Sequence, residues 1–130
     1  MLDEQAVVSN RVKKILVVED DEATGEVIQM VLAEEDSYST FLVADPEEVL
    51  EVASSIKPNL FVIDYRLAYM DGIMLYDKLH TIEGLEDVPA LIMSASLEQH
   101  GEELEARQLV GMEKPFDLDE FLETVKRMIA

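Results

Sequence analysis

The chain has 130 residues, of which 48% are hydrophobic, so it fits one domain with a substantial core and leaves no room for two. Its 29 acidic residues against 10 lysines and arginines give a net charge of −19, which argues against direct nucleic-acid binding, because that needs basic patches. There is no cysteine, no apolar stretch long enough to span a bilayer and nothing resembling a signal peptide, so we expect a cytoplasmic protein without membrane insertion.

Short apolar runs alternate with segments of helical period through residues 13–130, after a short arm over 1–12. The runs do not alternate between apolar and polar residues, which is typical of parallel strands buried on both faces. The chain is therefore predicted to form an α/β fold with a doubly wound parallel sheet, a (βα)5 pattern with helices on both faces. The predicted strands are 14–18, 40–44, 60–63, 90–93 and 109–113.

The predicted helices follow the strands and differ in strength. The first should bury Val27 and its apolar neighbours, and the last, capped by Asp117, should bury Leu118 and Phe121. The segment 97–107 is rich in glutamate and has few apolar residues, so it should be the weakest helix. Both histidines of the chain, His80 and His100, lie in polar helical contexts and are expected to be exposed to solvent.

Polar residues stand at the ends of four of the five predicted strands. Glu19, Asp20 and Asp21 follow the first strand, Asp64 the third, Ser94 the fourth and Lys114 the fifth. Open parallel sheets place their chemistry at the carboxyl edge, so these groups are expected to converge there.

The strand-end groups suit a divalent metal and a phosphoryl group. Oxygen ligands favour Mg²⁺, with Mn²⁺ as an alternative, and a carboxylate such as Asp64 can attack phosphorus. Each group also has an ordinary structural interpretation: the acids can cap a helix, Ser94 can be a turn serine and Lys114 a solvent-facing lysine. The Lys114–Pro115 bond can be cis.

Four stretches in this order resemble the response-regulator receiver domain: KKILVVEDDE, PNLFVIDYRLAYMDG, VPALIMSAS and EKPFDLDEFLETV. The resemblance covers residues 13 to about 130. It implies a five-stranded sheet of order 2-1-3-4-5, the flavodoxin-like order.

The resemblance also implies a role for each site residue. Asp64 is the phosphoacceptor, which receives the phosphoryl group from a phosphohistidine of a sensor histidine kinase or phosphotransfer protein. Glu19 and Asp20 hold Mg²⁺ together with Asp64 and the backbone carbonyl of Arg66. Ser94 senses the phosphoryl group, and Lys114 offsets its charge.

One position departs from the family. Three residues before Lys114 the family usually carries an aromatic that changes rotamer on phosphorylation, but this chain has Gly111. In the family, the last two helices and the strand between them form the usual output face. Gly111 and the acid-rich segment 97–107 put in doubt whether this chain uses that face.

Two functions are therefore expected to compete. The first is a stand-alone receiver that is not an enzyme and signals through a partner or a phosphorelay; the second is a receiver-like interaction domain that works without phosphorylation. A small phosphatase is disfavoured because Arg66 stands where such enzymes carry a second acid. The acidic surface is consistent with a downstream partner that has a basic face, although a solvated surface is the more common explanation of such a charge.

Overall fold

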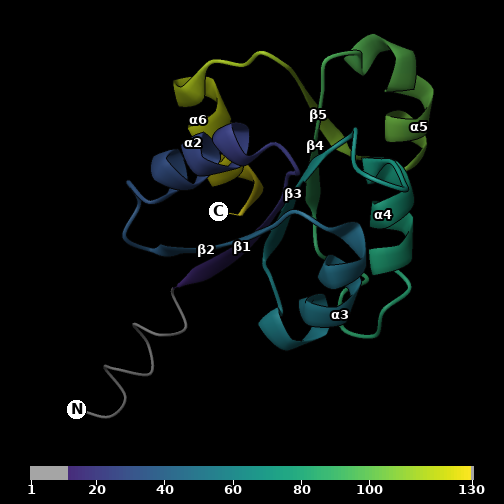
Figure 1. Cartoon of the computed structure of the whole chain (residues 1–130), viewed down its shortest axis with the longest axis horizontal. Coiled ribbons are helices and arrows are strands. Elements are labelled where there is room, and N and C mark those ends of the chain that lie inside the picture. Colours follow the sequence, from purple (N-terminus) through teal and green to yellow (C-terminus); the bar gives the residue numbers. More distant parts are fainter. Residues whose placement is uncertain (1–11, 130) are drawn as a thin grey trace.

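The computed structural model describes residues 12–129, which form five parallel strands with helices on both faces of the sheet (Figure 1). The strand order is β2-β1-β3-β4-β5, so the predicted doubly wound fold and its 2-1-3-4-5 order are confirmed. The strands are β1 (Lys13–Val18), β2 (Tyr38–Val43), β3 (Leu60–Asp64), β4 (Ala90–Ser94) and β5 (Val110–Glu113). The helices are α2 (Glu22–Leu32), α3 (Pro46–Ile56), α4 (Gly72–Leu79), the 3₁₀ helix η1 (Leu97–His100), α5 (Gly101–Ala106) and α6 (Leu118–Met128).

Alternate residues of the central strands enter two separate cores. Ile15 and Val17 of β1 pack with α2 and α6, whereas Leu16 and Val18 pack on the opposite face with α3, α4 and α5. Strands β3 and β4 are buried along their whole length, as the unbroken apolar runs predicted. This double burial fixes the carboxyl ends of β1, β3 and β4 relative to one another.

The sequence patterns were less informative about the edge strand β2 and about which apolar residues of the helices are buried. Strand β2 begins at Tyr38 rather than at residue 40, and all its residues are half-buried, as suits an edge strand. Val27 and Leu118 were predicted to be buried, and this is wrong: they are 43% and 41% exposed. Both line a shallow apolar hollow beside Lys114 rather than facing the sheet.

The segment that follows β4 buries few of its residues. It forms one 3₁₀ turn and a six-residue helix, and Leu104 is its one buried residue. The prediction of a weak fourth helix is confirmed. Among residues 12–129, no helix is both long enough and apolar enough to cross a membrane.

Two glycines that open helices provide a matched test of packing under the strand ends. A Cβ at Gly72 would lie 2.6 Å from the backbone oxygen of Asp64, whereas one at Gly101 would meet nothing within 4 Å. We expect Gly72→Ala to lower the free energy of unfolding by about 1–3 kcal/mol through overpacking. Gly101→Ala should be neutral or stabilise by up to about 1 kcal/mol. Urea denaturation measures both, and equal effects would contradict the close approach at Gly72.

Candidate functional site

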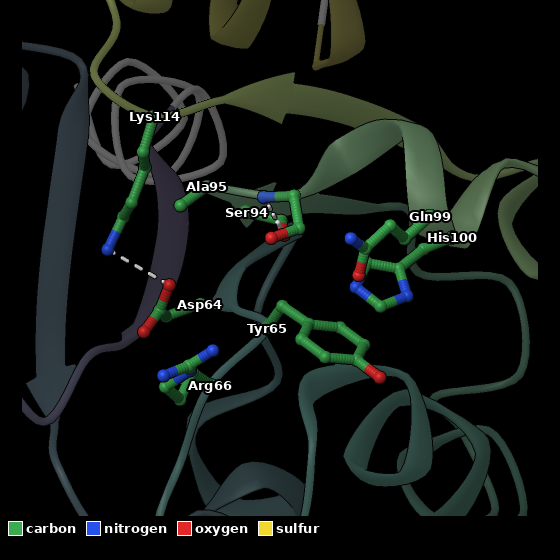
Figure 2. Close-up of a pocket in the computed structure, with 9 residues that line it drawn as sticks. Asp64, Tyr65, Arg66, Ser94, Ala95, Gln99, His100 and Lys114 are labelled. Atoms are coloured by element: carbon green, nitrogen blue, oxygen red, sulfur yellow. Dashed lines mark hydrogen bonds and ion pairs between the residues drawn. The ribbon is translucent and has the colours of Figure 1, made fainter.

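The predicted strand-end residues lie together at the carboxyl edge of the sheet. Asp64 ends β3 and Ser94 ends β4, while Glu19 and Lys114 directly follow β1 and β5. The strands are in register here, because Asp64 pairs with Met93 and Ser94 with Glu113. A cavity of about 390 Å³ opens between them, and its lining includes Asp64, Ser94 and Lys114 (Figure 2). The Lys114–Pro115 bond, which the sequence left open, is cis.

Lys114 is the cation that two buried carboxylates share. Its Nζ lies 2.9 Å from Glu19 Oε1 and 2.9 Å from Asp64 Oδ1. Glu19 is 2% exposed and Asp64 is 6% exposed, so both charges need a partner inside the protein. The lysine is held in turn by its backbone N–H, which donates to the carbonyl oxygen of Ser94 at 2.9 Å. Removing the lysine would therefore leave two buried acids facing each other.

Burial and pairing act in opposite directions on the pKa of Glu19 and on that of Lys114. Desolvation raises the pKa of Glu19 above its usual 4.5, although the hydrogen bond from Lys114 works against it. For Lys114, burial favours the neutral amine, but the hydrogen bonds to Glu19 and Asp64 outweigh it and raise the pKa. Because the folded protein holds the Glu19 proton to higher pH than the unfolded chain, the stability contributed by Glu19 is complete below pH 4.5. It is lost as the pH rises through the folded pKa.

The three consecutive acids, Glu19, Asp20 and Asp21, have two different roles. Asp21 caps α2, because its carboxylate accepts the backbone N–H of Thr24 at 3.0 Å. Glu19 and Asp20 are left free of that role, and together with Asp64 they offer oxygens that all lie within 4.8 Å of one another. Three carboxylates with no nitrogen or sulfur donor form a set that fits Mg²⁺ or Mn²⁺, with waters completing the shell. Asp20 is exposed, so this side of the cluster is open to solvent.

The far wall of the cavity was not anticipated from the sequence. Tyr65, which follows Asp64, stacks on His100 with ring centroids 3.8 Å apart, and both residues line the cavity. Figure 2 shows Asp64 directed toward Lys114 while the Tyr65 ring points the other way, toward His100. The expectation that both histidines are solvent-exposed is wrong. The His100 side chain is 13% exposed, and His80 is half-buried with its Nε2 lying 2.9 Å from the Val88 carbonyl oxygen. Helical period did not predict the partial burial of the two histidines, because the residues that they contact belong to other segments.

Leucines occupy the space beside Gly111. A Cβ at this position would lie 2.5 Å from Leu97 Cδ1 and 3.0 Å from Leu104 Cδ1. Position 111 therefore faces η1 and α5, and those segments supply the apolar groups themselves. No aromatic ring is available at this position of β5 to change rotamer.

Replacing Lys114 tests the shared cation. In Lys114→Met without metal, we expect the pKa of Glu19 to rise further, because the lysine is the main group that lowers it. Titration of the Glu19 carboxyl carbon by NMR measures this. Lys126→Met is the control, since Lys126 pairs with Glu35 at 3.4 Å on the surface and should leave Glu19 unchanged. An unchanged Glu19 pKa in Lys114→Met would contradict the shared-cation arrangement.

Comparisons with known proteins agree with this geometry. The chain is 30% identical over 119 residues to sporulation initiation phosphotransferase F of Bacillus subtilis (strain 168), a match that covers 90% of this chain and 94% of that protein. It is 30% identical over 118 residues to response regulator MprA of Mycobacterium avium (strain 104), covering 89% of this chain but 50% of that protein.

A solved structure shares both the fold and the family. The receiver domain of sensor histidine kinase PA1611 from Pseudomonas aeruginosa PAO1, with a magnesium ion in its active site cleft, superposes with a TM-score of 0.78 at 26% identity. The alignment covers 91% of this chain and 98% of that one. The model of the response regulator receiver domain matches residues 15–126, nearly the whole described chain. The chain therefore belongs to the response regulator receiver domain family of two-component signalling proteins.

Proposed function

We propose that the chain accepts a phosphoryl group on Asp64, in a Mg²⁺-dependent reaction, from a phosphohistidine of a sensor histidine kinase or phosphotransfer protein. One observation supports this above the others: Lys114 and the acids Glu19 and Asp20 surround Asp64 at the mouth of an open cavity.

Positioning and charge supply most of the catalysis in such a transfer. An Asp64 oxygen attacks phosphorus in line, a P–O bond forms as the donor P–N bond breaks, and that electron pair returns to the imidazole nitrogen. As the phosphoryl group arrives, Lys114 can turn its ammonium from the Asp64 carboxylate toward a phosphoryl oxygen. The Ser94 hydroxyl, on the same cavity wall, can donate to another oxygen.

The acid cluster would hold the metal. Glu19, Asp20 and Asp64 supply carboxylate oxygens, and the backbone carbonyl of Arg66 is the fourth proposed ligand. When bound, Mg²⁺ neutralises charge on the transferred phosphoryl oxygens. The Arg66 side chain is exposed and lines the cavity, where it can shield the phosphoryl group.

The surroundings of the site also suit a signalling role. Val27 and Leu118 provide exposed apolar surface next to Lys114, where a phosphodonor protein has to approach Asp64. The net charge of −19 favours a downstream partner with a basic face. Output would follow from changed affinity for that partner or from passing the phosphoryl group on. We therefore propose a phosphoacceptor that turns over no substrate of its own.

Intact mass spectrometry after incubation with a small phosphodonor tests the acceptor. We expect the wild type to gain one phosphoryl group with Mg²⁺ and none in EDTA. Asp64→Asn should gain none, because an amide oxygen is a poor nucleophile. The matched control is Asp36→Asn, which changes an exposed aspartate in the turn before β2, at the opposite edge of the sheet from the cavity, and should be phosphorylated like the wild type.

The competing function is an interaction domain that works without phosphorylation, and the absent aromatic at Gly111 is what favours it. This function requires that Asp64→Ala bind the downstream partner as tightly as the wild type does. A wild type that gains no phosphoryl group with Mg²⁺ would overturn the phosphoacceptor proposal and leave this alternative.

A further inference from the structure

The 3₁₀ helix η1 is held at both ends by residues that adjoin the acceptor site. At its start, the backbone N–H of Ser96 donates to Ser94 Oγ at 2.9 Å. At its end, His100 stacks on the ring of Tyr65, the residue next to Asp64. The two attachments come from the ends of β4 and β3, the strands that present Ser94 and Asp64. Any displacement at the acceptor site therefore reaches η1 through two separate contacts.

Both contacts, the Ser96–Ser94 hydrogen bond and the Tyr65–His100 stack, can transmit a change at the acceptor site to η1. A hydroxyl has one proton to donate and two lone pairs to accept with, so Ser94 can donate to a phosphoryl oxygen and still hold the Ser96 amide. The Tyr65 backbone is fixed, because its N–H donates to the Met93 carbonyl at 2.7 Å and its carbonyl accepts from Gly72 at 2.7 Å. With the backbone fixed, the parts able to shift are His100 and the Tyr65 ring, whose hydroxyl donates to Asp71 Oδ2 at a long 3.4 Å.

The segment that receives the change is easily moved. No residue of η1 is buried, and α5 buries Leu104 alone, so few apolar contacts hold the two helices. The far end of this segment is fixed instead, because Arg107 forms a two-point ion pair with Asp77 of α4 at 2.7 and 2.8 Å. A segment pinned at one end and attached to the site at the other is suited to pivot.

We propose that the Tyr65–His100 stack couples occupancy of Asp64 to the position of η1 and α5. It would take the place of the rotamer-changing aromatic that Gly111 cannot provide. The proposal rests on the phosphoacceptor function above and concerns how that state is read out. The ring contact differs between the empty and the occupied site, and a partner that binds η1 and α5 senses that difference. His100 is in this scheme a positioning residue that acts through Tyr65.

The other histidine of the chain is a matched control. His80 also packs against a tyrosine ring, Tyr76, with centroids 3.9 Å apart and the rings tilted by 40°, but neither residue lines the acceptor cavity. Removing His80 costs the same kind of aromatic contact without touching the proposed coupling. His100→Phe keeps a ring against Tyr65 and should preserve the coupling.

The experiment follows backbone amide signals by ¹H–¹⁵N NMR before and after beryllofluoride and Mg²⁺ are added. In the wild type, His80→Ala and His100→Phe, we expect signals to shift both around Asp64 and Ser94 and across residues 102–107. In His100→Ala, signals around Asp64 should shift as before, while the response of residues 102–107 is lost.

Three outcomes would overturn the proposal in distinguishable ways. A response of residues 102–107 that persists in His100→Ala would show that coupling does not pass through the stack. Signals from α5 that are already disordered in His100→Ala before the mimic is added would show that the stack only holds the segment in place. A wild type with no shift around Asp64 would instead overturn the phosphoacceptor function itself.

Discussion

The arrangement of the site depends on one interaction, in which the buried carboxylates of Glu19 and Asp64 share the ammonium group of Lys114. Glu19 and Asp64 would repel each other at the end of the sheet, and burial deprives them of water. Lys114, 2.9 Å from each, makes the arrangement stable in the resting protein. In the proposed function the same lysine also serves the phosphoryl group, for which a compact charge on a flexible stem is suited. The resting ion pair and the proposed chemistry therefore use one set of contacts.

The fold holds the charged side chains of Glu19, Asp64 and Lys114 in position. Strands β1, β3 and β4 are buried on both faces, so their ends cannot slide without disturbing two cores. Gly72 allows α4 to begin against the backbone of Asp64, since any side chain there would meet the Asp64 carbonyl. Asp21 caps α2 and thereby leaves Glu19 and Asp20 to form a carboxylate cluster with Asp64. Rigid strands carry the charged groups, while the adaptable parts lie in the connections that follow.

Much of this could be read from the sequence, and the exceptions share a cause. Unbroken apolar runs predicted the central strands, and the resemblance to receiver domains implied the strand order. The polar residues at the strand ends, Asp20, Asp64, Ser94 and Lys114, predicted where the site lies. The partly buried positions of His80 and His100 could not be predicted from the sequence, because their partners, Val88 and Tyr65, belong to other segments. Helical period likewise placed Val27 and Leu118 inward, although their side chains are 43% and 41% exposed.

The most direct test of the shared-cation site is a crystal structure with Mg²⁺ and beryllofluoride. We expect beryllium bonded to an Asp64 oxygen, the metal held by Glu19, Asp20 and Asp64, and the Lys114 ammonium moved from the Asp64 carboxylate to a fluoride. A structure in which the mimic binds elsewhere, with Lys114 still paired to both Glu19 and Asp64, would contradict the central claim that this ion pair is the resting form of a phosphoryl site.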